Sequence, residues 1–270
     1  MEVIVRPTRE SAVALVARLI ADRLRARPEL VLGLATGRTM EQVYQALIAS
    51  GVSFARATTF NLDEYIGLGP ESPHSYAYYM RARLFDHVDI DPANTHLPDG
   101  TASDLKQAAA DYERLIREAG GIDLQLLGIG ESGHIGFNEP LSAISSRTRD
   151  KTLTPTTRRQ NAAMFGGDPE RVPTRALTMG VGTILEAREL LLLACGSAKA
   201  EVVARAVEGP ITASVTASAL QLHANCKVVL DEEAAALLKG RDYYDFVFRN
   251  EPDWAAYQDT DAPPAPPAKR

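Results

Sequence analysis

Cysteine is scarce in this 270-residue chain: Cys195 and Cys226 are the two present, and each lies in an apolar run. Two such residues form neither the pairing pattern of a small disulfide-rich scaffold nor a Cys-x-x-Cys metal motif. Basic residues are also in deficit, with 29 Lys and Arg against 35 Asp and Glu, for a formal net charge of −6. Because nucleic acids and anionic membranes bind basic faces, we expect neither as a partner, and we expect two reduced, buried thiols.

Long apolar runs are missing as well. No stretch approaches the roughly 18 uncharged apolar residues of a membrane span, and the first seven residues do not resemble a signal peptide. The composition, with 45% hydrophobic and 24% charged residues, is that of a globular protein with a sizeable core. We therefore expect a cytoplasmic protein.

Short aliphatic runs alternate with longer amphipathic ones, which is the pattern of parallel strands joined by crossover helices. Strands are expected at Glu2–Val5, Leu30–Leu34, Thr58–Leu62, Leu124–Ile129, Leu190–Ala194 and Lys227–Leu230. Helices are expected at Glu10–Ala26, Met40–Ala49, Ser75–Phe85, Leu105–Glu118, Lys199–Val207 and Glu232–Leu238. The pattern predicts an α/β, doubly wound, mostly parallel sheet in a single domain of residues 1–261. Residues 262–270 contain four prolines and are expected to form a disordered tail.

Ligands of open parallel sheets bind beyond the carboxyl ends of the strands, so the segments that follow the expected strands are of most interest. The first, Gly33–Met40, is a loop of small residues between a strand and a helix. Its backbone N–H groups, with the side chains of Thr36, Arg38 and Thr39, suit a phosphate, although a plain strand-to-helix turn remains the alternative. No Gly-Lys-Ser/Thr sequence ends the loop, so it is not a nucleotide P-loop.

The second segment, Thr59–Tyr65, ends in the adjacent carboxylates Asp63 and Glu64. Neighbouring residues of a strand point to opposite faces, so both carboxylates cannot enter one pocket in the same way. We expect one to be catalytic or ligand-binding and the other structural. A solvated strand end is the alternative.

The third segment, Leu126–Pro140, contains the spacing G-x-G-x-x-G at Gly128, Gly130 and Gly133. A dinucleotide site would need a helix to begin at the third glycine, but Gly136 and Pro140 follow within two turns and disfavour a helix there.

The remaining feature of this segment is His134, close in sequence to Glu139, a pair suited to general acid and base catalysis. Ser132 lies in no nucleophile elbow. The spacing of these residues and of Asp63 and Glu64 fits no metal motif, so no metal is expected.

Together, these segments resemble glucosamine-6-phosphate deaminase. The most specific similarities are Phe60–Leu68 and Gly133–Pro140, and others continue through Ser146–Arg149, Ala176–Thr183 and Gly196–Lys199. The sister family, 6-phosphogluconolactonase, has a similar Gly-His loop without the Phe-Asn-Glu-Pro continuation and is the weaker match.

This resemblance implies a Rossmann-like sheet and the conversion of D-glucosamine 6-phosphate and water to D-fructose 6-phosphate and ammonia, with no metal or organic cofactor. It implies that Asp63 transfers a proton from C2 to C1 of the opened sugar, while His134, supported by Glu139, assists ring opening. The residues that would bind the substrate are Thr36, Gly37, Arg38, Thr39 and Lys199. The pathway implied is amino-sugar catabolism.

The chain departs from the family at two places near this site. Ser132 occupies a position where the family often has Asp or Asn, so the charge on a protonated His134 would rest on Glu139 alone. Ala163 stands where many members have a lid arginine that reaches the phosphate. We expect Arg38 to supply the missing guanidinium, with Arg158 and Arg159 as rival donors, so that removing Arg38 raises KM.

Some bacterial members are hexamers activated by N-acetylglucosamine 6-phosphate. The residues matching that effector site, Ser142, Arg149, Lys151 and Thr152, are present, so a homo-oligomer and an effector are expected partners, with a solvated basic loop as the alternative. A lid at about residues 153–173 would be the moving element. Two other functions remain open: deamination of a different epimer such as galactosamine 6-phosphate, and non-catalytic sensing of a sugar phosphate.

Overall fold

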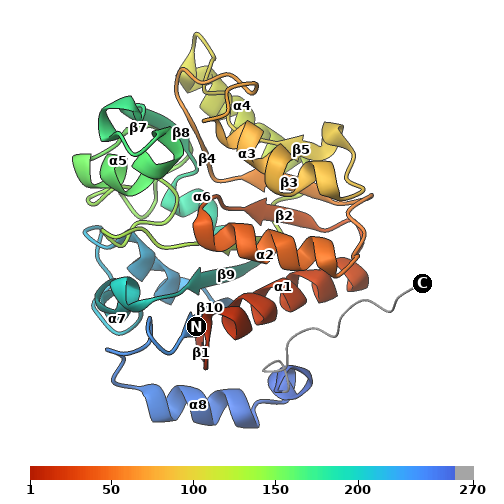
Figure 1. Cartoon of the computed structure of the whole chain (residues 1–270), viewed down its shortest axis with the longest axis vertical. Helices are drawn as coiled ribbons and strands as arrows, with labels where there is room; N and C mark the ends of the chain where they lie inside the picture. The colour runs from red at the N-terminus through yellow and green to blue at the C-terminus, as the bar shows by residue number, and fades with distance from the viewer. Residues whose placement is uncertain (259–270) are drawn as a thin grey trace.

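The computed structural model describes residues 1–258; the expected proline-rich tail lies outside the described residues. A seven-stranded sheet has the order β1-β10-β9-β6-β2-β3-β5, and every neighbouring pair in it is parallel. Its strands are β1 (Glu2–Arg6), β2 (Val31–Leu34), β3 (Thr58–Asn61), β5 (Thr95–His96), β6 (Leu124–Leu127), β9 (Glu189–Ala194) and β10 (Cys226–Asp231). Helices flank this sheet (Figure 1). The predicted α/β fold is therefore confirmed.

Three of the longer helices begin where the sequence provides a side-chain cap. Thr8 and Ser11 form a reciprocal capping box at the start of α1, and Ser75 and Asp104 cap α3 and α4 with their side-chain oxygens. The helices of this group are α1 (Arg9–Ala26), α2 (Arg38–Ala49), α3 (Tyr76–Arg83), α4 (Leu105–Glu118), α7 (Ala200–Val207) and α8 (Arg241–Asn250). In Figure 1, α1 and α2 lie side by side across one face of the sheet.

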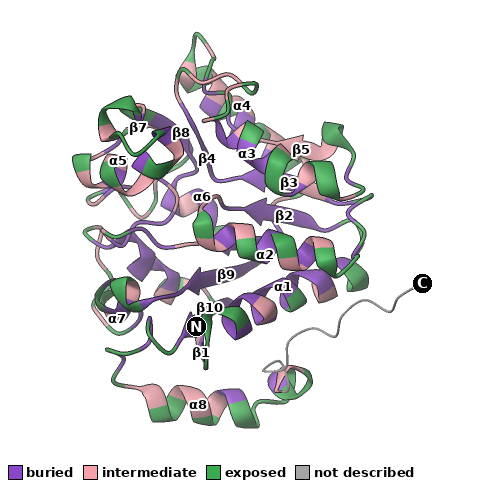
Figure 2. Ribbon diagram, in the orientation of Figure 1, coloured by how far each residue is buried: buried purple, intermediate pink, exposed green. Residues whose placement is uncertain are grey.

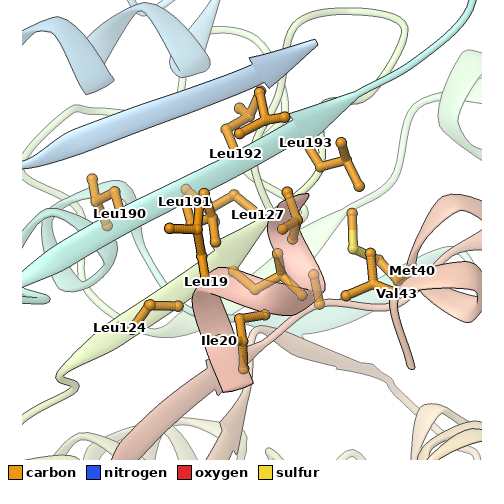
Figure 3. Close-up of a cluster of buried hydrophobic side chains, with 14 of the residues drawn as sticks. Leu19, Ile20, Met40, Val43, Leu124, Leu127, Leu190, Leu191, Leu192 and Leu193 are labelled. Atoms are coloured by element: carbon orange, nitrogen blue, oxygen red, sulfur yellow. The ribbon is translucent and has the colours of Figure 1, made fainter. Parts of the chain in front are cut away.

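The core lies between these two helices and the sheet. Figure 3 shows Leu19 and Ile20 of α1 and Met40 and Val43 of α2 facing aliphatic side chains of β6 and β9. All four helical residues are buried, and so is every residue of β6 and β9 (Figure 2). Strands buried on both faces read as continuous aliphatic runs, which explains why the sequence located them well.

A second, antiparallel sheet of three short strands lies beside the first, in the order β4-β8-β7. Its strands are β4 (Asp63–Tyr65), β7 (Arg149–Thr152) and β8 (Arg175–Thr178), with the short helices α5 (Pro155–Asn161) and α6 (Val181–Leu185) nearby in sequence. Tyr65, Tyr76, Phe137 and Phe165 pack together in a separate aromatic cluster on this side. The sequence analysis did not predict this sheet.

One predicted helix is wrong. Residues 232–238 form turns with isolated hydrogen bonds, such as Leu238 N–H to Ala235 C=O. The carboxylate of Asp231 accepts the N–H of Ala234, and that of Glu208 accepts the N–H groups of Lys239 and Gly240, so side chains replace helical backbone partners. Helix α8, which was not predicted, follows instead.

Cys195 and Cys226 are both free and buried, as expected. Burial raises the pKa of each thiol to about 12, which keeps both protonated at neutral pH. Within residues 1–258, no helix combines the length and apolar character of a membrane span.

Candidate active site

A cavity of about 520 Å³ lies at the carboxyl edge of the parallel sheet. Its walls come from the loops that follow β2, β6 and β9, which are adjacent strands, together with Asp63 at the start of β4. All nine residues expected to carry catalysis or bind substrate fall on these loops or strands. Seven of them line the cavity: Thr36, Gly37, Arg38, Thr39, Asp63, His134 and Lys199. The chemical roles of these residues stay predictions.

Two buried tyrosines fix the backbone of the loop after β2 by hydrogen bonds to its carbonyl groups. The Tyr79 hydroxyl donates to the Gly37 carbonyl at 2.9 Å, and the Tyr44 hydroxyl donates to the carbonyl of Ala35. Gly37 has a φ of +128°, which favours glycine, and provides no side-chain cap for α2. The N–H groups of Arg38 and Thr39 have no hydrogen-bond partner among the described residues, so this helix start can donate to an anion.

Two cations face this loop. Lys199 donates from Nζ to the Ile129 carbonyl at 2.8 Å. Its pKa is lowered mainly by burial and further by the charge of Arg38, and it is raised by Glu131. The Arg38 side chain is exposed and forms no ion pair with any described residue. The two positive charges are therefore close enough to share one anionic ligand.

Asp63 and Glu64 have different surroundings, as the alternation of a strand requires. The Glu64 carboxylate accepts the N–H groups of Tyr65, Tyr76 and Ala77 at 2.8–2.9 Å, so it anchors the start of α3. Asp63 lines the cavity instead. Burial raises the pKa of Asp63 to about 8, the negative charge of Glu64 adds to the rise, and the Phe137 N–H opposes it.

Two side chains lie close to the Nδ1 atom of His134. Ser132 Oγ lies 2.7 Å from Nδ1, and Glu139 Oε2 lies 3.8 Å from it. Glu139 accepts the Thr154 N–H through Oε1, whereas its Oε2 is buried with no hydrogen-bond partner among the described residues. Burial lowers the pKa of His134, Glu139 raises it and Lys199 lowers it. Ser132 is thus the hydrogen-bond partner of Nδ1, and Glu139 is the nearby negative charge; that Glu139 alone stabilises the charge of a protonated His134 stays a prediction.

The imidazole lies directly against the backbone of Gly130. A Cβ atom added at Gly130 would overlap Nε2, Cε1 and Cδ2 of His134. The Gly130 N–H also donates to the His134 carbonyl at 2.9 Å, which closes the loop on itself. A glycine is therefore required at this position for the ring to occupy its place.

The expected lid contacts the cavity through α5. Gln160 and Asn161 line the cavity, and the Glu131 N–H donates to the Gln160 side chain at 3.1 Å. The two rival arginines point elsewhere: Arg158 donates to the Val172 carbonyl, and Arg159 donates to Thr156. Of the three arginines considered for the phosphate, Arg38 is the one that lines the cavity.

The four expected effector residues lie outside the cavity lining. Ser142 is buried with its Oγ unpartnered, whereas Arg149, Lys151 and Thr152 are on β7. Arg149 donates to the Asn138 side chain at 2.7 Å, one residue before Glu139. The structure therefore places this group beside the loop of His134, but not in the same cavity.

The sequence analysis missed three charged residues of the cavity, Arg9, Glu131 and Glu233. Arg9 follows the first strand, so the rule that directed attention to the other loops could have found it. Among the described residues, no group of three or more His, Cys, Asp or Glu side chains is arranged to hold a metal ion.

Comparison with known proteins gives consistent results. Residues 7–229 match the family described as glucosamine-6-phosphate isomerases/6-phosphogluconolactonase. The chain is 54% identical over 245 residues to a glucosamine-6-phosphate deaminase of Rhodopirellula baltica, covering 89% of this chain and 97% of the relative. It is 48% identical over 258 residues to one of Streptomyces coelicolor, covering 94% and 99%.

Solved structures are also similar to this chain. A structure described as a monomeric glucosamine-6-phosphate deaminase has a TM-score of 0.85 and 45% identity, covering 88% of this chain and all of that one. The 6-phosphogluconolactonase of Trypanosoma cruzi has a TM-score of 0.72 but only 19% identity, with 88% and 97% covered. The second similarity concerns the fold alone.

Proposed function

The chain belongs to the family of glucosamine-6-phosphate isomerases and 6-phosphogluconolactonases, and from this premise we propose that it is a glucosamine-6-phosphate deaminase. The reaction is D-glucosamine 6-phosphate + water → D-fructose 6-phosphate + ammonia. The observation that carries the proposal is a buried carboxyl, Asp63, in the same cavity as an imidazole and two cations. Proton abstraction from a phosphorylated sugar needs these groups together.

The phosphate binds at the loop after β2. Free N–H groups of Arg38 and Thr39, the hydroxyls of Thr36 and Thr39, and the charges of Arg38 and Lys199 surround a dianion with donors. Binding there directs the sugar carbons toward Asp63 and His134, on the loops of the neighbouring strands.

His134 opens the pyranose ring. Its imidazole accepts the proton of the C1 hydroxyl and passes it to the ring oxygen, so the C1–O5 bond breaks and an aldehyde forms. A neutral imidazole is needed to accept the first proton, and the lowered pKa of His134 favours that form. The hydrogen bond between Ser132 and Nδ1 fixes the orientation of the ring, and Glu139, 3.8 Å away, stabilises the imidazolium once the ring is protonated.

Asp63 then moves the proton that converts aldose to ketose. Its carboxylate takes the C2 proton, and the electron pair forms a C1=C2 double bond while the C1 carbonyl oxygen gains the proton that the substrate ammonium loses. The lone pair of the resulting amine then forms C2=N as Asp63 returns its proton to C1, which leaves a C2 iminium and a C1 hydroxyl. Water adds at C2 and the C–N bond breaks, which releases ammonia and leaves the ketone. In the empty site burial raises the pKa of Asp63 to about 8. The substrate ammonium lowers that pKa by opposite charge and so ionises the base.

A comparison of substrates tests this function. The purified protein is incubated with glucosamine 6-phosphate, galactosamine 6-phosphate and 6-phosphogluconolactone, and ammonia and sugar products are measured. We expect ammonia chiefly from glucosamine 6-phosphate. Lactone hydrolysis without ammonia release would contradict the proposal.

Ser132 provides a prediction about the imidazole. Ser132→Ala leaves Nδ1 without its nearest partner, so we expect kcat/KM to fall about 10-fold, the cost of one buried, unpaired polar group. Ser132→Asp adds a negative charge, which raises the pKa of His134 and moves the corresponding limb of the pH–rate profile to higher pH. Profiles unchanged in both variants would place Ser132 outside the catalytic group.

The effector site also belongs to the proposal. Thr178 of β8 is paired with Arg149 of β7 on one side and with Asp63 of β4 on the other. A ligand bound at β7 could therefore shift Asp63 through a single intervening strand. We expect N-acetylglucosamine 6-phosphate to lower KM about 5-fold or more, and Lys151→Ala to remove this response. The oligomeric state, for which a homo-oligomer such as a hexamer is expected, is measured by sedimentation. The molar mass of a monomer would contradict the expected oligomer, and a KM that does not change when the effector is added would contradict the expected activation. The test is informative because the related structure is described as monomeric. The cytoplasmic location likewise stays a prediction.

A further inference from the structure

Two helices that pack side by side each begin with an arginine at the cavity. Arg9 is the first residue of α1, and Arg38 is the first residue of α2. Both helices follow strands of the same parallel sheet on the same face, so both amino ends lie at its carboxyl edge (Figure 1). Both arginine side chains line the cavity of the proposed active site.

Arg9 reaches the loop that carries Lys199. One terminal guanidinium nitrogen of Arg9 lies 3.0 Å from the position that a Cβ atom on Gly196 would take. Gly196 begins the Gly196–Lys199 loop after β9, and it has a φ of +91°, which favours glycine. The guanidinium therefore lies against the wall of the cavity from which Lys199 projects.

Neither arginine is neutralised within the described part of the chain. No hydrogen bond or ion pair joins the side chain of Arg9 or Arg38 to a carboxylate there, whereas Arg23, Arg27 and Arg241 all pair with one. Four carboxylates besides Asp63 lie near these cations. Hydrogen bonds and, further, the charge of Arg9 lower the pKa of Glu10, and Glu233 accepts the Ser197 N–H and places Oε2 3.9 Å from the same Cβ position on Gly196. Against the effect of burial, Glu131 raises the pKa of Lys199, and Glu41 pairs with Arg83.

Both arginines place a positive charge in the first turn of a helix. A positive charge there opposes the helix dipole. Two such charges at one cavity, beside Lys199, repel one another as well. A dianionic ligand between them removes both penalties.

We propose that Arg9 is a further phosphate-binding residue, which acts with Arg38 and Lys199 to select phosphorylated over unphosphorylated amino sugars. This inference rests on the proposed function for the identity of the phosphate ester. It also accounts for Ala163, which is exposed and outside the cavity lining. Arg9 on α1 and Arg38 on α2 together supply the guanidinium groups that the lid lacks.

The test compares Arg9→Gln with Arg25→Gln, a matched variant in the last turn of α1, where Arg25 pairs with Asp22 on the surface. KM and kcat are measured for glucosamine 6-phosphate, and the Kd of inorganic phosphate is measured by calorimetry. Arg9→Gln removes a charged hydrogen bond to the phosphate, so we expect KM and the phosphate Kd to rise about 10-fold or more. We expect kcat to stay within about 2-fold of the wild-type value. Arg9→Lys recovers part of the loss, and Arg25→Gln matches the wild type.

The outcomes separate this inference from the proposed function. If Arg9→Gln and Arg25→Gln have the same KM and the same phosphate Kd, the role of Arg9 is overturned while ammonia release still supports the deaminase. If the wild type releases no ammonia, the deaminase is overturned, and the phosphate Kd of the two variants still decides whether Arg9 binds the anion. Equal melting temperatures verify that all variants are folded.

Discussion

Asp63→Asn lowers kcat for deamination by about 10³-fold or more, because an amide cannot accept the C2 proton and a general base contributes up to about 10⁴-fold. The substitution preserves the shape of the side chain and keeps an oxygen near the Phe137 N–H, which donates to the Thr178 hydroxyl at 3.1 Å, so the cavity remains intact. KM for glucosamine 6-phosphate therefore changes much less than kcat. Initial rates of ammonia release measure both constants, and a variant that keeps more than a tenth of the wild-type kcat would exclude Asp63 as the base.

The same substitution stabilises the protein in a pH-dependent way. The folded pKa of Asp63, about 8, lies above the value near 3.9 of an unfolded aspartate. Between these values the unfolded chain loses a proton that the folded protein retains, so this group costs stability increasingly as the pH rises from about 4 to 8. We expect Asp63→Asn to raise the free energy of unfolding by a few kcal/mol at pH 8, with little gain at pH 4.

Chemical denaturation at the two pH values measures this difference. Asp104→Asn is the matched control, because asparagine also caps α4 and the side chain is exposed. A gain in stability that is equal at pH 4 and pH 8 would show that the buried carboxyl is not its source.

Gly130→Ala lowers kcat/KM by about 100-fold or more. The added methyl group would occupy the space of the His134 ring, which is buried and bonded to Ser132. The ring must leave its position, and a displacement of about 1 Å at a catalytic group costs on the order of 100-fold in rate. The value of kcat/KM is measured from initial rates with glucosamine 6-phosphate.

Gly128→Ala is the control for that experiment. It lies two residues earlier in the same loop, its φ is not positive, and an added Cβ would meet only the flexible end of Met40 at 3.4 Å. We expect kcat/KM to fall much less in Gly128→Ala than in Gly130→Ala. Equal losses in the two variants would attribute the effect to the loop backbone instead of the imidazole.

The sequence predicted the parallel sheet because each buried strand is a continuous aliphatic run, as in Leu190–Ala194. It could not predict β7, whose residues Arg149–Thr152 are polar and become a strand only by pairing with β8. The expected helix at residues 232–238 failed for a related reason. Its periodicity is genuine, but distant carboxylates such as Glu208 bind the backbone that follows it.

Local rules also located much of the candidate site. Alternation along a strand separated Asp63 from Glu64 correctly, since it depends on the backbone alone. The position of Ser132 against Nδ1 of His134 depends on the fold of a glycine loop, which residue spacing does not define. Arg9 was missed although it follows the first strand, because a lone arginine there forms no motif; the packing of α1 against α2 brings it to the same cavity as Arg38.

The most direct test of the central claim is the product balance of the wild-type protein with glucosamine 6-phosphate. Ammonia and fructose 6-phosphate are quantified in the same reaction without added metal or cofactor. The account predicts that the two products form in a 1:1 ratio and that both are lost together in Asp63→Asn. Tight binding of the substrate with neither product formed would contradict it.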